Sequence, residues 1–258
     1  MSTRARRASA AAVGGSVAVA AVLVAQARHT VRRGDLPTVV GSDASGVEIP
    51  AVHSDRVLRL AAAGDSTLTG PGLADNAHIW VRQVARRLAA REHVHVHVSS
   101  FAVGGSRVRD VLRAQLDPLV ACAPDIVLVA VGSNDAIRLT PLDRFERELH
   151  TLVRQLVAAV PAVVVGGVGD LGGIARVPFP LSRVLRARGR RVNRVIRSVA
   201  AAYDVHYIDV STVDGAFRRG GVEVFSPDLF HPNEYGHALW ARAAAPIVAH
   251  AARSLSPR

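Results

Sequence analysis

The sequence predicts a single α/β domain, built on a parallel sheet that helices cover on both faces. The chain has 258 residues, of which 49% are hydrophobic and 21% are charged, so it can bury one full core. From residue 57 onward, apolar runs of strand length alternate with segments of helical periodicity, which is typical of parallel sheets. Several of these runs end in polar clusters, and parallel strands bring such clusters to one edge of the sheet.

Residues 8–27 form an uncharged run rich in Ala, Val and Gly, with arginines on both sides. Two interpretations of residues 1–27 remain open. The Ala25-Gln26-Ala27 triplet fits a cleavage site, which favours a signal peptide that is removed. The run is also long enough to span a bilayer as an uncleaved membrane anchor. Either interpretation predicts an extracytoplasmic protein, secreted or anchored to the membrane. The flanking arginines are Arg4, Arg6, Arg7, Arg28, Arg32 and Arg33.

Residues 28–54 are polar and contain several Gly, Pro, Ser and Asp residues. This composition indicates a loop-like lead-in or stalk. The regular alternation of strands and helices begins after it, so we assign residues 55–258 to the folded domain.

The formal net charge is +11, and it would be +8 without residues 1–27, which contain three arginines and no acidic residue. An exported protein with this charge is attracted to anionic lipid head groups or cell-wall polymers. No nucleic-acid-binding motif is present, so we expect no nucleic-acid partner. Cys122 is the one cysteine, which excludes an internal disulfide and a cysteine-based metal site.

The first predicted strand, residues 57–63, runs into the turn Gly64-Asp65-Ser66. A serine hydroxyl attacks a carbonyl only when a general base lies within hydrogen-bond reach and donors await the oxyanion. Taken alone, Ser66 equally suits an ST-turn or a helix N-cap. The hypothesis that Ser66 is a nucleophile therefore depends on what the other strand ends supply.

The second predicted strand has an unusual row of histidines. It follows a helix predicted at residues 76–90, in which Trp80 lies in the core. Residues 93–98 alternate His and Val, which predicts valines on one face and three histidines on the other. Such a row can bind a metal, but no carboxylate or fourth ligand can be named. We therefore favour a solvated or edge-facing strand.

Two more turns carry residues that a ligand would use. Gly104 and Gly105 precede a helix predicted at residues 107–120, where glycines either let the backbone approach a ligand or supply a positive φ. The third strand, residues 126–131, is continuously apolar and leads to Asn134. This places Asn134 at the carboxyl edge of the sheet, as a ligand-binding residue or as a helix cap.

The remaining elements are a helix at 142–159, a strand at 162–166, a helix at 181–202 and a strand at 205–210. The helix at 181–202 contains a glycine, which weakens the prediction of one unbroken helix. Five arginines at helical spacing give it either a solvated face or a contact with an anionic surface. They are Arg183, Arg186, Arg190, Arg194 and Arg197.

Asp228 and His231 lie on the loop before the last predicted helix, which begins at about Asn233, directly after Pro232. The three-residue step lets the carboxylate accept a hydrogen bond from one imidazole nitrogen while the other nitrogen faces the active site. A serine, glycines, an amide and an Asp-His pair are the groups that acyl transfer requires.

Four segments, in this order, resemble the conserved blocks of the SGNH (GDSL-type) hydrolase family. They span most of residues 57–249. The absence of a GxSxG elbow argues against the α/β-hydrolase fold, the main alternative for a serine esterase. The segments are Gly64-Asp65-Ser66, Ala102-Val103-Gly104-Gly105-Ser106, Gly132-Ser133-Asn134-Asp135 and Asp228-Leu229-Phe230-His231-Pro232.

The resemblance implies a flavodoxin-like three-layer α/β/α sandwich with a five-stranded parallel sheet. It implies that Ser66 is the nucleophile, His231 the general base and then acid, and Asp228 the residue that orients His231. The backbone N–H groups of Ser66 and Gly105 and the side-chain amide of Asn134 would form the oxyanion hole. No metal or organic cofactor is implied.

The sequence also departs from the family pattern in one place. The second block commonly opens with Asn, and Ser100 holds that place here, so the hydrogen bonds of this turn are expected to differ. By contrast, Asp65 and Asp135 are expected to brace their turns, and His237 to lie in packing or on the surface.

Three functions follow from this pattern. The first is an exported serine hydrolase, a monomer that cleaves acyl or acetyl esters of small-molecule, lipid or glycan substrates. The second is an acetyl esterase or O-acyltransferase that acts on cell-envelope glycans. The third is an inactive envelope-binding module, against which the intact set of Ser66, Asp228 and His231 argues.

Overall fold

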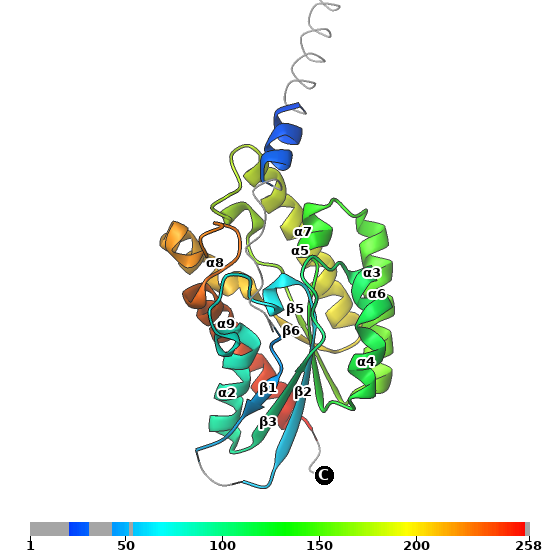
Figure 1. The fold of residues 1–258 in the computed structure, drawn as a ribbon. Helices are drawn as coiled ribbons and strands as arrows, with labels where there is room; N and C mark the ends of the chain where they lie inside the picture. Colours follow the sequence, from blue (N-terminus) through cyan, green and yellow to red (C-terminus); the bar gives the residue numbers. More distant parts are fainter. Residues whose placement is uncertain (1–20, 31–42, 52–53, 256–258) are drawn as a thin grey trace, which may run out of the picture.

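The computed structural model describes residues 21–30, 43–51 and 54–255. Helices cover both faces of a central sheet, which gives three layers (Figure 1). The sheet has six strands in the order β1-β3-β2-β4-β5-β6. The strands are β1 (Gly46–Glu48), β2 (Val57–Gly64), β3 (His95–Ser100), β4 (Ile126–Ala130), β5 (Ala162–Gly166) and β6 (His206–Ile208).

The five strands that the sequence predicts are parallel to one another, as expected. Their register pairs Gly64 with Ala130 and Ala130 with Gly166. Because β2, β4 and β5 end at one level, the turns that follow them meet at the carboxyl edge of the sheet. The fold class predicted from the sequence is confirmed.

The sixth strand, β1, lies in the segment predicted to be loop-like. It pairs antiparallel with β3 at the edge of the sheet. Glu48 ends β1 and is 8% exposed, and its carboxylate pairs with Arg82 at 2.8 Å and Arg86 at 3.2 Å. These arginines belong to a helix far along the chain, so the strand is stabilised by a tertiary contact that three residues of local sequence cannot indicate.

Within the described residues, helices cover both faces of the sheet. Alternate residues of β2 divide between the two cores: Leu60 and Ala62 pack in one, and Ala61 and Ala63 pack in the other. This alternation follows from the period of two along a strand. The first face carries α2 (Trp80–Glu92) and α9 (Glu234–Arg253); the second carries α3 (Val108–Ala114), α4 (Leu116–Ala121), α6 (Leu142–Ala159) and α7 (Leu181–Ala202).

One helix predicted from the sequence is divided in two, and another is unbroken although it contains a glycine. The helix predicted at residues 107–120 is two helices, α3 and α4, which meet at Gln115. Pro118 explains the break, because proline has no N–H to donate to the carbonyl four residues earlier. The helix α7 is unbroken despite Gly189, which is buried and lies close to Leu171.

The row of histidines is shorter than predicted. His93 ends α2 in the left-handed conformation, with φ of 52°, and β3 begins at His95. The valines between them are buried as expected, and His97 is exposed. The three histidines therefore do not share one strand face.

The shorter elements lie mostly at the carboxyl edge of the sheet or in the loops that follow it. They are α5 (Ser133–Ile137), α8 (Asp214–Gly220) and the 3₁₀ turns η1 (Ser66–Leu68), η2 (Asn76–His78), η3 (Leu171–Gly173), η4 (Val210–Val213) and η5 (Gly221–Val224).

Residues 21–30 are helical. Most of the segment predicted as a signal peptide or anchor, residues 1–20, lies outside the described residues, as do residues 31–42 of the predicted lead-in. None of the helices in the described ranges has both the length and the hydropathy of a membrane span.

Candidate active site

Ser66 stands at the start of η1, directly after β2 and the turn residues Gly64 and Asp65. Gly64 has φ of +154°, and a Cβ there would lie 1.9 Å from the carbonyl oxygen of Ala130. Only glycine fits this close approach. Asp65 then caps η1, since its Oδ1 accepts the N–H of Thr67 at 3.0 Å. Strand, glycine and cap together fix Ser66 at the carboxyl edge.

His231 lies between Ser66 and Asp228, although Ser66 is 165 residues away in the chain. Its Nε2 is 3.2 Å from Ser66 Oγ, and its Nδ1 is 2.7 Å from Asp228 Oδ2. His231 is 6% exposed. The structure therefore brings together the three residues that the sequence predicted as nucleophile, base and orienting acid.

The loop before α9 holds the Asp-His pair in place. Asp228 Oδ1 accepts the backbone N–H groups of Phe230 at 2.9 Å and His231 at 3.0 Å, while Ser226 N–H donates to the His231 carbonyl at 2.7 Å. Burial opposes ionisation of Asp228, but its hydrogen bonds with His231 and Phe230 outweigh it and hold its pKa below the ordinary value. Asp228 is thus an anion, and it can accept a hydrogen bond from the imidazole of His231.

The turn after β3 lies beside Ser66. A Cβ on Gly104 would be 4.0 Å from Ser66 Cβ, and Gly105 has φ of +79°, which glycine adopts without strain. Within the described part of the chain, the backbone N–H groups of Ser66 and Gly105 donate to no protein acceptor. Two free donors next to a serine hydroxyl are the arrangement that an oxyanion requires.

Asn134 is the third predicted donor, and it lies on α5 after β4. Its Nδ2 is 3.4 Å from Asp65 Oδ2, so the amide is aimed at the turn that carries Ser66. The predicted oxyanion donors thus come from the ends of three neighbouring strands, β2, β3 and β4.

We expect Asn134→Ala to lower kcat for ester hydrolysis about 10²- to 10³-fold, which is typical for loss of one oxyanion donor. KM should change little, because the amide would act on the charge that develops in the transition state. The measurement is steady-state hydrolysis of p-nitrophenyl acetate, with thermal melting as the check on folding. An unchanged kcat in a folded variant would remove Asn134 from the oxyanion hole.

Asp65 and Asp135 brace their turns, as the sequence predicted. Asp65 is 1% exposed, and burial raises its pKa to about 6, although the hydrogen bond from Thr67 opposes this shift. Asp135 is also buried, which raises its pKa, and its Oδ2 accepts the Val108 N–H at 3.1 Å. That bond ties α5 to the start of α3.

Gln115 is a structural residue of the site that the sequence analysis missed. It is 1% exposed, and its side chain bonds both the N–H of Gly64 at 2.8 Å and the carbonyl of Gly64 at 3.0 Å. Its Nε2 also donates to Ser106 Oγ at 3.0 Å. Gln115 therefore links the turn that carries Ser66 to the turn that carries Gly105. The sequence does contain one signal for this role of Gln115, because a polar residue stands on the apolar stripe of a predicted helix.

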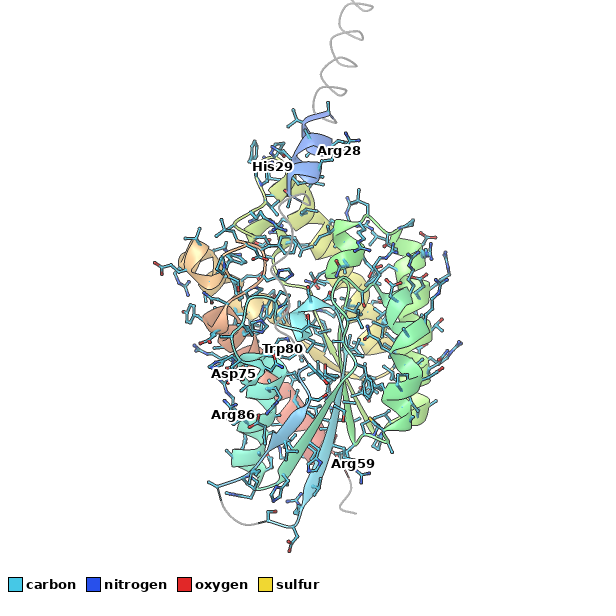
Figure 2. All side chains as sticks on the ribbon, in the orientation of Figure 1. Arg28, His29, Arg59, Asp75, Trp80 and Arg86 are labelled. Atoms are coloured by element: carbon cyan, nitrogen blue, oxygen red, sulfur yellow. The ribbon has the colours of Figure 1, made fainter. Side chains whose placement is uncertain are left out.

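His237 is buried, which is one of the two positions expected for it. It is 1% exposed, and its Nδ1 accepts the backbone N–H of Trp80 at 3.2 Å. This satisfies a free donor at the N-terminus of α2; Trp80 itself is 5% exposed and lies where α2 begins (Figure 2). Burial lowers the pKa of His237 to about 3, so the ring is neutral and links α9 to α2.

We expect wild-type protein to lose stability as the pH falls from 6.5 toward 3 partly because of His237. The unfolded chain protonates this histidine near pH 6.5, while the folded chain keeps it neutral to about pH 3. The unfolded state binds more protons in this window, which costs the folded state about 1.4 kcal/mol per pH unit. Urea unfolding at several pH values should show a shallower decline for His237→Gln. Parallel declines would contradict the assignment.

A cavity of about 100 Å³ opens beside Ser66 and His231. Its walls are mainly apolar and come from the loop after β5 and from the segments around α8 and α9. Among the described residues, no three His, Cys, Asp or Glu side chains are close enough to hold a metal ion. The apolar walls include Val168, Ile174, Ile208, Phe225, Phe230 and Trp240.

The fold and the site place this chain in a known class. Residues 62–239 match the GDSL-like Lipase/Acylhydrolase family, which is more than half of the chain, so the protein belongs to this family. A GDSL-like esterase of Mycobacterium tuberculosis is 32% identical over 181 residues, which are 69% of this chain and 57% of that protein. The chain thus spans a little over half the length of this curated relative.

Solved structures show the same fold. A single-residue variant of an acetyl xylan esterase from Geobacillus stearothermophilus superposes with a TM-score of 0.60 and 21% identity, over 76% of this chain and 96% of that one. The protein TesA gives a TM-score of 0.60 and 23% identity, over 74% of this chain and 97% of that one.

Proposed function

We propose that this protein is a carboxylic ester hydrolase in which Ser66 is the nucleophile, His231 the general base and Asp228 the orienting acid. The observation that carries the proposal is the position of His231, with Nε2 3.2 Å from Ser66 Oγ and Nδ1 2.7 Å from Asp228 Oδ2. These distances let one imidazole accept the serine proton while a carboxylate stabilises the resulting cation.

In the first half of the reaction, Ser66 Oγ attacks the ester carbonyl carbon as its proton passes to His231 Nε2. The carbonyl oxygen becomes an oxyanion, which the N–H groups of Ser66 and Gly105 and the amide of Asn134 stabilise. The tetrahedral intermediate then breaks its bond to the alcohol oxygen. His231 returns the proton to that oxygen, and an acyl-serine remains.

In the second half, water takes the place of the alcohol. His231 accepts a proton from water, the hydroxide attacks the acyl carbon, and the second intermediate expels Ser66 Oγ. The proton returns to the serine, and the carboxylic acid leaves. Asp228 stays ionised throughout, since its hydrogen bonds keep its pKa low.

Relatives support this assignment. The relative from Mycobacterium tuberculosis is a GDSL-like esterase. Catalytic mutants of the Geobacillus acetylxylan esterase replace a serine, an aspartate or a histidine by alanine, and that aspartate precedes that histidine by three positions. Asp228 and His231 have the same spacing.

The cavity favours esters with short acyl groups. Its volume of about 100 Å³ is smaller than the engineered cavity of about 150 Å³ that accommodates benzene in another protein. A cavity of this size suits an acetyl group, so a second candidate function is the removal or transfer of acetyl groups; cell-envelope glycans are the substrates we propose for it. The uncharged run before residue 28 and the net charge of +11 support an extracytoplasmic location, secreted or anchored to the membrane.

A fluorophosphonate probe with peptide mapping tests the nucleophile. The full chain should be labelled on Ser66, and p-nitrophenyl acetate should block the labelling in proportion to its turnover. Labelling at another serine, or none on folded protein, would overturn the assignment and favour a binding module. Release of acetate from envelope polysaccharide would favour the glycan esterase over a lipase-like enzyme.

A further inference from the structure

The helix of residues 21–30 has one face on the domain and one face in solvent. Leu23, Gln26 and Ala27 are partly buried, and Thr30 is 6% exposed. These positions follow the i, i+3, i+4, i+7 spacing of a packed helical stripe. Leu23 and Ala27 contact the core on the α7 side of the sheet. The helix is thus packed as an element of the domain.

Gln26 makes the most specific contact of this helix. Its Nε2 donates to the carbonyl of Phe179 at 2.6 Å, and its Oε1 accepts the N–H of Leu181 at 3.2 Å. Leu181 is the first residue of α7, where a backbone N–H has no partner within its own helix. A signal peptide that is cut off after Ala27 would take Gln26 with it, and both hydrogen bonds would be lost.

The solvent face of this helix continues onto the segment before and into α7, residues 175–184. Exposed apolar side chains gather on the two segments, where Phe179 is 69% exposed. Together the segments expose two arginines and contain no Asp or Glu. We call residues 21–30 and 175–184 the apical surface. Its exposed apolar side chains are Val22, Val24, Phe179 and Val184, and its exposed arginines are Arg28 and Arg183.

The apical surface lies at the end of the molecule toward which the parallel strands run (Figure 1). Figure 2 shows Arg28 and His29 at this end and Arg59, near the start of β2, at the other. Ile174, next to the apical surface, lines the same cavity as Ser66. The surface therefore borders the loop that forms one wall of the candidate active site.

We propose that residues 21–27 are retained in the mature protein and that the apical surface rests on a bilayer rich in anionic phospholipid. Apolar side chains mixed with arginines are the composition of surfaces that lie at a lipid interface. Residues 8–20, which directly precede this helix in the sequence, carry no charge, so the adjoining chain is apolar as well. The mouth of the Ser66 cavity then faces the membrane, and the ester substrate reaches it from the lipid surface.

The first test is the mass of the full chain after expression in a bacterium and separation of membranes from soluble protein. The expected result is a membrane-bound protein whose mass includes residues 21–27. A soluble product that begins at Arg28 would overturn the proposal. Hydrolysis of p-nitrophenyl acetate by the same preparation is independent of this result, so failure of the membrane proposal and failure of the proposed esterase are distinguished.

The second test measures orientation with a fluorescent side chain. The full-length variant Phe179→Trp is placed in vesicles of phosphatidylglycerol and brominated phosphatidylcholine, and wild-type protein gives the emission of the native tryptophans. Bromine should quench the added emission. The matched control is Val157→Trp, because Val157 is also exposed, at 42%, and lies near the start of β5 at the opposite end. Equal quenching at both positions, or none at Trp-substituted Phe179, would contradict the proposed orientation.

Discussion

Ser66→Ala is expected to reduce kcat for p-nitrophenyl acetate at least about 10⁴-fold, the largest effect of any single change at this site. The substitution removes the oxygen that would form the acyl-enzyme, and no other hydroxyl is shown within reach of His231 Nε2 among the described residues. The residual rate of this variant is expected to come from substrate binding and the oxyanion donors alone. Steady-state kinetics and the loss of an acyl-enzyme burst measure the effect.

Ser198→Ala is the matched control, because Ser198 is an exposed serine on α7, away from the site. It should keep wild-type kinetics and take up no fluorophosphonate. Ser66→Ala should also keep its thermal stability, since the turn is fixed by Gly64 and Asp65 rather than by the hydroxyl. Substantial esterase activity in folded Ser66→Ala would show that another group performs the chemistry.

Local patterns were sufficient to predict which residues lie at the carboxyl edge of the sheet. A buried strand, a glycine and a polar residue form a unit of a few residues. The positions of Ser66, Gly105 and Asn134 can therefore be predicted from the residues that directly precede each of them. The Asp228–His231 step is equally local. Parallel pairing then brings these units together, because β3, β2 and β4 are neighbours and end at the same edge of the sheet.

The features that the sequence did not predict depend on contacts between distant segments. β1 is stabilised by Glu48 against Arg82 and Arg86, and no local pattern records that pairing. Gln115 joins two turns through hydrogen bonds to Gly64, 51 residues away, and to Ser106. The helical periodicity of the sequence predicts that Gln115 lies on a helix, but it does not predict these contacts. The packing of Gln26 against Phe179 and Leu181 spans more than 150 residues, so the apolar run that contains Gln26 suggested only an export signal or an anchor.

Asp228→Asn is expected to reduce kcat about 10⁴-fold while the fold is kept, as in the same change in another Ser-His-Asp enzyme. The variant retains an oxygen that can accept the N–H groups of Phe230 and His231, which Asp228 Oδ1 binds now. Its amide nitrogen would face His231 Nδ1, where Oδ2 lies at 2.7 Å. A donor at that place favours the imidazole tautomer whose proton is on Nε2, and this tautomer cannot accept the proton of Ser66.

The comparison with Asp228→Ala separates orientation from structure. Alanine removes both backbone hydrogen bonds of the loop as well as the contact with His231, so it should lower thermal stability in addition to activity. Asp228→Asn should lower activity alone, with KM near the wild-type value, because the carboxylate acts on the imidazole and not on bound substrate. If Asp228→Asn kept wild-type kcat across neutral pH, the carboxylate would not set the tautomer of His231. The loop would then position the histidine by its backbone bonds only.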